Sequence, residues 1–115
     1  MTVKIYHNPR CSKSRQTLAL LKDHGVEPKI IEYLKTPPTK IELIRILLML
    51  GIGARSLMRK KEAEYKTEGL DDTGLDDAAL IAAMITHPIL IERPIVVSET
   101  KAVIGRPPEN ALDIL

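Results

Sequence analysis

Two strand-like ends enclose a helical middle in this chain, and that order limits the folds open to it. Residues 3–6 alternate between apolar and polar side chains, and residues 29–33 are β-branched and apolar, so both are predicted as strands. Two more strands are expected at residues 94–97 and 102–104. The order β-α-β, a helical block and then β-β-α predicts a small α/β sheet that carries a helical insertion over about residues 38–87.

Residues that satisfy free backbone groups mark the helices of this middle segment. Thr39 and Glu42 have the spacing of a capping box, in which each side chain bonds a free backbone N–H at the start of a helix. Asp76 or Asp77 is expected to cap a second helix, which Pro88 would end. The inward face of that helix is predicted to hold Leu80, Ile81 and Met84.

Length and composition favour one globular domain with an aliphatic core. The chain has 115 residues, so residues 1–115 are expected to form a single domain, and its hydrophobic content of 44% excludes a disordered protein. Tyrosine is the only aromatic type, with three copies, which argues against binding of single-stranded nucleic acid by base stacking. A net charge of +2 is too small to imply a polyanionic partner, so no nucleic acid is expected.

Apolar runs in this chain are too short for a membrane span. None reaches the roughly 18 residues that a helix needs to cross a bilayer. The first five residues lack the pattern of a signal peptide. We therefore expect no membrane association and a cytoplasmic location.

Cys11 is the only cysteine, and this restricts any redox chemistry. One thiol cannot close an internal disulfide or build a thiolate-based structural zinc site, and no metal is expected. A redox reaction at Cys11 would therefore need a thiol from another molecule.

Cys11 is predicted to lie in a loop after the first strand, directly before a helix that begins at Ser12. Free N–H groups and the positive end of the helix dipole favour a thiolate over a thiol there. Arg10, Lys13 and Arg15 add positive charge nearby in the sequence. The pattern predicts a reactive thiol with a lowered pKa.

Other interpretations of these residues are open at this point. A lone cysteine in an intracellular protein is more often an inert buried side chain, although the polar and cationic surroundings of Cys11 argue against that here. His7 could donate a hydrogen bond to the thiolate or supply positive charge, or it could pack in the loop. His24 and His87 have the positions of structural residues.

The same loop is suited to bind an anion, because backbone N–H groups at a helix start hold oxyanions and Ser12 and Ser14 add hydroxyl donors. A phosphatase-type loop would place an arginine six residues after the nucleophile, but that position is Thr17. Arginines that hold a dianion must therefore come from elsewhere in the chain. Three candidates, each more typical of a surface charge when taken singly, are Arg59, Arg93 and Arg106.

Several separated blocks together resemble the glutaredoxin-dependent arsenate reductase family. The blocks are Tyr6-His7-Asn8-Pro9-x-Cys11-x-x-Ser14-Arg15, Leu57-Met58-Arg59-Lys60, His87-Pro88-Ile89-Leu90-Ile91-x-Arg93-Pro94-Ile95-Val96-Val97 and Gly105-Arg106-Pro107. They cover nearly the whole chain in the right order. The resemblance implies a thioredoxin-like fold with a mixed sheet and a helical insertion. The end of the chain at Leu115 resembles a shorter branch of the family whose members are named by homology.

The resemblance also implies roles for individual residues. Cys11 matches the nucleophile, His7 matches the histidine that supports the low pKa of that thiol, and Ser14 matches a nearby loop serine. The three arginines around the oxyanion would be Arg59, Arg93 and Arg106. Pro94 would be a cis-proline.

The reaction that the resemblance implies is the reduction of arsenate to arsenite. The thiolate would form a covalent adduct with arsenic, which glutathione and glutaredoxin would resolve, with glutathione as a co-substrate and without a bound cofactor. Phosphate or sulfate is expected to compete for the site.

One alternative is a glutathione-linked thiol reductase of the same fold with another substrate. A second is a transcriptional redox regulator, although its Cys-x-x-Cys switch would have Ser14 in place of the second cysteine.

Overall fold

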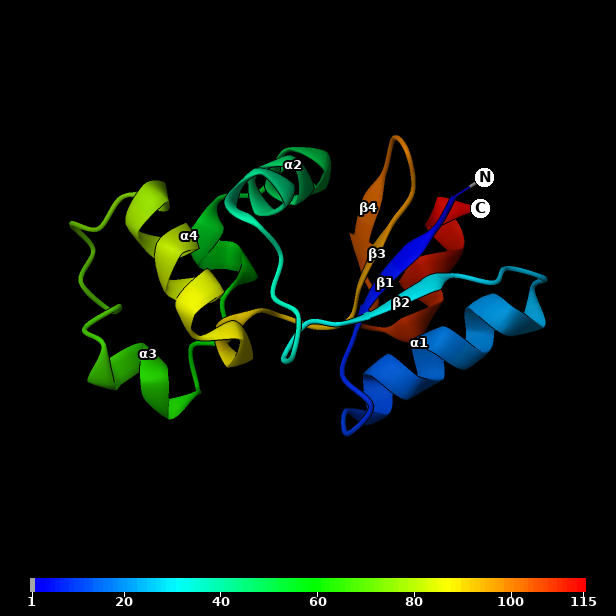
Figure 1. Ribbon diagram of the computed structural model, residues 1–115, viewed down its shortest axis with the longest axis horizontal. Helices are drawn as coiled ribbons and strands as arrows, with labels where there is room; N and C mark the ends of the chain where they lie inside the picture. Colours follow the sequence, from blue (N-terminus) through cyan, green and yellow to red (C-terminus); the bar gives the residue numbers. More distant parts are fainter. Residues whose placement is uncertain (1) are drawn as a thin grey trace. The chain divides into compact units, whose positions relative to one another are not determined.

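The computed structural model describes residues 2–115 and divides them into two compact units (Figure 1). The first unit contains residues 2–36 and 93–115, and the second contains residues 37–92. The first carries the sheet, and the second is helical. The single domain expected over residues 1–115 stays a prediction.

The first unit is built around a four-stranded sheet. Its strands are β1 (Lys4–His7), β2 (Lys29–Glu32), β3 (Ile95–Val97) and β4 (Ala102–Ile104), in the spatial order β2-β1-β3-β4. β1 pairs with β2 in parallel and with β3 in antiparallel orientation, and β3 pairs with β4 in antiparallel orientation. The predicted α/β fold class with a mixed sheet is therefore confirmed.

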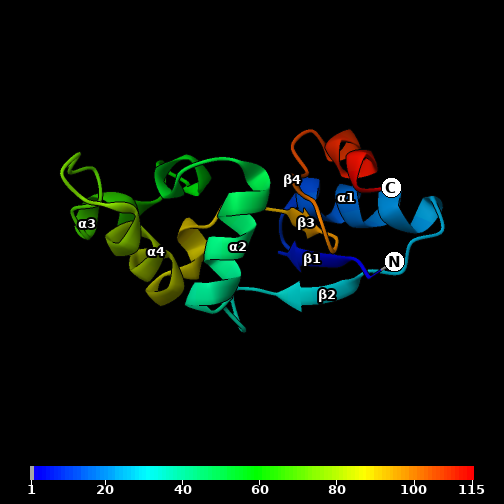
Figure 2. The same ribbon diagram turned by 90° about the horizontal axis from the view of Figure 1, so that it is seen from above.

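One face of the sheet is covered by two helices. These are α1 (Ser12–Asp23) and the 3-10 helix η3 (Pro108–Ile114), which pack against each other (Figure 2). The core between them and the sheet is aliphatic, as predicted, and is made of Val3, Ile5, Leu21, Val96, Ala111 and Ile114. The three tyrosines, Tyr6, Tyr33 and Tyr65, are also buried.

His7 is the last residue of β1, where the sequence predicted a loop. Its backbone pairs with that of Glu32, so the parallel ladder with β2 continues one residue beyond the alternating apolar pattern. Because the strand holds its backbone, the imidazole of His7 is buried, with 6% of the residue exposed. The sequence pattern missed this because it follows apolar side chains, and His7 is polar.

The second unit contains helices α2 (Lys40–Leu50), α3 (Ala63–Thr67) and α4 (Asp77–Thr86), and the 3-10 helices η1 (Ala54–Leu57) and η2 (Pro88–Leu90). α4 packs against α2, η1 and η2. The sequence did not predict α3, because its five residues are too few to show an apolar period. Within residues 2–115, no helix is long and apolar enough to cross a bilayer.

The caps of α2 and α4 follow the predicted chemistry. The backbone N–H of Glu42 donates to Thr39 Oγ1 at 3.2 Å, and the N–H of Thr39 donates to Glu42 Oε1 at 2.9 Å, so the capping box is confirmed. Of the two candidate caps of α4, Asp76 is the one whose side chain accepts from the N–H of Ala79, at 2.9 Å. The predicted inward residues Leu80, Ile81 and Met84 are buried.

Candidate active site

The loop between β1 and α1 places the cysteine at the start of a helix. Cys11 is the N-cap residue of α1 and has an extended backbone. Its N–H donates to the carbonyl oxygen of Asn8 at 3.0 Å, and the N–H of Arg10 donates to Asn8 Oδ1 at 3.0 Å. Arg15, one turn into α1, donates from Nη1 to the carbonyl oxygen of Pro9 at 2.9 Å. The loop is thus fixed both by its own turn and by the helix that follows it.

The thiol of Cys11 is half-exposed, so it is not the inert buried side chain that a lone cysteine often is. Partial burial raises the pKa of the Cys11 thiol, but several groups lower that pKa by more. They are the backbone N–H of Ser14, the positive charge of Arg93, the backbone N–H of Lys13 and a hydrogen bond from Arg106. The net effect lowers the thiol pKa and favours the thiolate, which is the nucleophilic form.

Two arginines from the second half of the chain act on the sulfur, Arg106 through a contact and Arg93 through its charge. Arg106 Nη1 lies 3.8 Å from Cys11 Sγ, within hydrogen-bonding distance for sulfur, and 3.4 Å from the carbonyl oxygen of Arg93. Arg93 comes shortly before β3 and Arg106 shortly after β4. Because β3 and β4 are antiparallel, with Ile95 paired to Ile104, these two positions meet at the same end of the sheet. The sheet therefore assembles a cationic environment that no local spacing could predict.

The segments that carry these arginines are joined through Pro94 and Gly105. The sequence predicts a cis-proline at position 94, and the Arg93–Pro94 peptide bond is cis. The N–H of Gly105 donates to the carbonyl oxygen of Pro94 at 2.9 Å. This bond extends the pairing of β3 and β4 up to the arginines.

A buried pair of polar side chains lies behind the cysteine loop. His7 Nδ1 and Ser14 Oγ are 2.6 Å apart, and the same Ser14 oxygen accepts a hydrogen bond from the N–H of Asn8 at 3.0 Å. The Ser14 hydroxyl accepts from Asn8 and also has one proton of its own, which it can donate to His7 Nδ1. The arrangement therefore suits a neutral imidazole whose proton is on Nε2.

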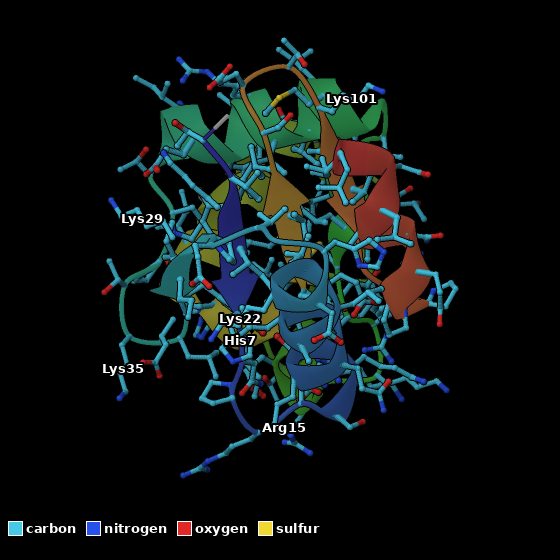
Figure 3. All side chains as sticks on the ribbon, turned by 90° about the vertical axis from the view of Figure 1, so that its right-hand side faces the viewer. His7, Arg15, Lys22, Lys29, Lys35 and Lys101 are labelled. Atoms are coloured by element: carbon cyan, nitrogen blue, oxygen red, sulfur yellow. The ribbon has the colours of Figure 1, made fainter. Side chains whose placement is uncertain are left out.

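Burial lowers the pKa of His7, and the charges of Arg15 and Lys22 lower it further, while Glu32 raises it. The net shift is downward, which favours the neutral form of the imidazole. Figure 3 shows His7 where β1 ends, with Arg15 at the nearby end of α1. This lowered pKa disfavours the interpretation in which His7 supplies positive charge to the site, and the role of His7 stays a prediction.

His7 is linked to the sulfur through Ser14. The side chain of Ser14 bonds His7, while its backbone N–H is a hydrogen-bond donor to Cys11. The structure thus brings together five of the predicted site residues, namely Cys11, His7, Ser14, Arg93 and Arg106, with Pro94 beside them.

Arg59 belongs to the second unit, and its contacts there are local. Its Nη2 forms an ion pair with Glu62 Oε1 at 2.6 Å, and its Nη1 donates to the carbonyl oxygen of Ile89 at 3.3 Å. The backbone N–H of Arg59 also donates to the carbonyl oxygen of Leu90, at 2.7 Å. A role for Arg59 in holding an oxyanion stays a prediction.

Two residues that shape this site were given no role in the sequence analysis. Asn8 builds the turn before Cys11, and its position before Pro9 is a common turn signal that could have indicated this. Gly105 lies closely against α1 and Pro94, which only the folded chain reveals. Among residues 2–115, no three His, Cys, Asp or Glu side chains gather as metal ligands would.

A family comparison accounts for this combination of residues. A model of the ArsC family matches residues 6–114, which is nearly the whole chain. The chain belongs to the ArsC family. The family resemblance seen in the sequence is thereby confirmed.

Relatives of this ArsC-family protein include enzymes and a protein of unassigned function. It is 57% identical over 114 residues to the uncharacterized protein YfgD of Escherichia coli (strain K12), covering 98% of this chain and 96% of that one. It is 49% identical over 114 residues to an arsenate reductase of Neisseria meningitidis serogroup B, covering 98% and 97% of the two chains.

A solved structure supports the same assignment of fold. The arsenate reductase from Vibrio cholerae matches this ArsC-family protein with a TM-score of 0.96 and 55% identity, covering 100% of this chain and 98% of that one. The likeness confirms the predicted α/β, thioredoxin-like fold class.

Proposed function

We propose that this protein reduces arsenate to arsenite, with Cys11 as its nucleophile. The observation that carries the proposal is the thiol at the start of α1, whose pKa is lowered by helix N–H groups and by the nearby guanidinium groups of Arg93 and Arg106. Membership of the ArsC family supports it, as do the arsenate reductases at 49% and 55% identity.

The first step is attack of the Cys11 thiolate on arsenic. An arsenic–sulfur bond forms and one arsenic–oxygen bond breaks, and the departing oxygen leaves as water after it is protonated. Arsenic remains in the +5 state in this adduct. We assign the proton to solvent water, because the imidazole of His7 is neutral, buried and bonded to Ser14.

Guanidinium groups suit the arsenate oxyanion because they donate paired hydrogen bonds to tetrahedral anions. Arg93 and Arg106 already act on the sulfur, so an oxyanion that approaches the thiolate also approaches them. The N–H groups of Ser14 and Lys13 at the helix start add further donors at the sulfur. Arg59 is the proposed third arginine. Phosphate and sulfate present similar oxygens and should compete without being reduced.

Reduction requires two electrons, and this chain has only one cysteine to offer. We assign both electrons to external thiols. Glutathione attacks arsenic, and an arsenic–sulfur bond replaces a second arsenic–oxygen bond, with loss of another water. A glutaredoxin thiolate then attacks the glutathione sulfur, so that a disulfide between the two forms and the electron pair of the broken bond stays on arsenic, which becomes arsenic(III). Water then cleaves the bond between arsenic and Cys11, which releases arsenite and returns Cys11 to the thiolate. In total, arsenate and two thiols give arsenite, one disulfide and water, with no bound cofactor.

A coupled assay tests this proposal. Glutathione, glutaredoxin, glutathione reductase and NADPH are combined with the protein, and the loss of NADPH is followed after arsenate is added. The expected result is arsenate-dependent oxidation of NADPH that needs both glutathione and glutaredoxin. Phosphate or sulfate alone should give none and should raise the KM for arsenate.

The contrary result is an intact protein without arsenate-dependent oxidation of NADPH. If the protein, assayed without glutaredoxin, then catalysed the reduction of a glutathione mixed disulfide and lost this activity in Cys11→Ser, it would instead be a glutathione-linked reductase with another substrate.

A further inference from the structure

A glycine beside one of the site arginines lies unusually close to α1. A Cβ atom on Gly105 would lie 2.6 Å from Thr17 Oγ1 and 2.9 Å from both Thr17 Cγ2 and Pro94 Cγ. Real Cβ atoms essentially never come within 3.0 Å of such neighbours. Thr17 is fully buried and β-branched, and the ring of Pro94 is rigid, so neither can turn away.

Space, rather than backbone conformation, requires the glycine at this position. Gly25, Gly51 and Gly69 have positive φ angles, whereas the φ of Gly105 is not positive. An alanine at position 105 would therefore not strain its own backbone. It would push the segment after β4 away from α1 and Pro94.

Two hydrogen-bonding groups of Gly105 fix this segment. Its N–H donates to the carbonyl oxygen of Pro94 at 2.9 Å. Its carbonyl oxygen lies 3.3 Å from Thr17 Oγ1, whose shorter hydrogen bond is to the carbonyl oxygen of Lys13 at 2.8 Å. Because Thr17 and Cys11 belong to the same helix and its cap, a segment held against Thr17 is also held in a fixed position relative to the sulfur.

We propose that Gly105 is a positioning residue for Arg106. Because Gly105 has no side chain, the segment after β4 lies against Thr17 and Pro94, and this approach holds the guanidinium of Arg106 at the Cys11 sulfur. Position 17 is where a phosphatase-type loop would carry its own arginine. Here Thr17 instead contacts the segment that brings an arginine from the other end of the chain.

The proposal rests on the proposed function only for its turnover readout, since the thiol pKa is measured without arsenate. Gly105→Ala should move the guanidinium away from the sulfur and raise the thiol pKa by about 0.5–1 unit, because an opposite charge stabilises the thiolate. It should also lower kcat/KM for arsenate by about 3- to 10-fold. Gly53→Ala is the matched control. The nearest atom to a Cβ on Gly53 would be Asp77 Oδ2, at 3.8 Å, and the φ of Gly53 is not positive. That variant should leave the thiol pKa unchanged.

A double-variant cycle separates positioning from general damage. The thiol pKa is measured by ultraviolet titration in the wild type, Gly105→Ala, Arg106→Ala and the variant that carries both changes. If Gly105 acts through Arg106, Gly105→Ala raises the pKa in the wild type and adds nothing once Arg106 is alanine. An equal rise in both backgrounds, or no rise in the folded single variant, overturns the proposal.

Thr17→Val keeps the test decisive if Gly105→Ala does not fold. Valine has nearly the same shape as threonine but cannot bond the carbonyl oxygen of Gly105. We expect a smaller rise of the thiol pKa, again absent in the Arg106→Ala background. A thiol pKa unchanged by Thr17→Val would then overturn the proposal. If the variants show these pKa shifts but the wild-type protein does not reduce arsenate, the proposed function is contradicted and the role of Gly105 is not.

Discussion

The two sides of the Cys11 sulfur are built in different ways. On one side, the N–H groups of Lys13 and Ser14 come from the next residues of the chain, and they are in place as soon as α1 begins. On the other side, Arg106 comes from 95 residues away and reaches the sulfur only when β3 and β4 have paired. The first side includes the backbone N–H of Ser14, which lowers the thiol pKa more than any other single group. The second side makes full activation depend on the completed sheet.

Removal of the sulfur, which both sides act upon, should have the largest effect. Cys11→Ser should reduce arsenate turnover at least about 1,000-fold, because a serine hydroxyl is a poor nucleophile without a base. The half-exposed side chain contributes little to packing, so the free energy of unfolding should change by less than about 1 kcal/mol. The coupled assay and urea unfolding measure the two quantities. Retained arsenate reduction in this variant would remove the sulfur from the mechanism.

The sheet-dependent side alone is tested by Arg93→Ala. Loss of this charge should raise the thiol pKa and weaken oxyanion binding, with a fall in kcat/KM of about 10- to 100-fold, mostly through KM. Arg45→Ala, which removes an exposed arginine of α2, is the matched control and should change neither quantity. An Arg93→Ala protein with the thiol pKa of the wild type would show that the charge acts elsewhere.

The local side is tested by Ser14→Ala. This change leaves the backbone N–H that faces the sulfur but removes the hydroxyl shared by His7 and Asn8. Unsatisfied buried polar groups should cost about 1–3 kcal/mol in the free energy of unfolding, while the thiol pKa should move only slightly. Ser12→Ala, on an exposed neighbour, should change the unfolding free energy by less than about 0.5 kcal/mol. A large rise of the thiol pKa with an unchanged free energy of unfolding would contradict this account, because it would show that the hydroxyl, and not the backbone N–H, lowers the thiol pKa.

The smallest expected effect is a pH dependence from His7. Its pKa is lower in the folded than in the unfolded protein, so the unfolded state binds the proton more readily. Its contribution to stability is therefore complete above the unfolded pKa and is lost as the pH falls below the usual histidine pKa of about 6.5. In His7→Gln the unfolding free energy should therefore decline less over this range than in the wild type. Equal slopes in His7→Gln and the wild type would contradict the neutral, buried imidazole.

Features that depend on local contacts could be predicted from the sequence, and features that depend on distant contacts could not. Cys11 before a helix and the capping box of Thr39 depend on a few consecutive residues, and the structure has both. The meeting of Arg93 and Arg106 at the sulfur depends on strand pairing, so their spacing gave no sign of it and only the family resemblance suggested it.

Two features of the site could not be predicted from the sequence, for the same physical reason. The neutral state of His7 follows from burial at the end of β1, and the need for glycine at position 105 follows from the approach of α1. Burial and close approach are properties of the packed chain. The sequence pattern of a histidine beside a loop, or of a glycine after a strand, is the same whether or not another element packs against that residue.

The central claim is that the folded protein keeps the Cys11 thiol charged, and one titration tests it directly. The ultraviolet absorbance of the thiolate is followed against pH in the folded protein and in the same protein unfolded in urea, with Cys11→Ser subtracted to remove tyrosine ionisation. The proposed chemistry predicts a clearly lower midpoint in the folded protein, because the helix N–H groups and the two arginines act only there. An equal or higher midpoint in the folded protein would contradict it.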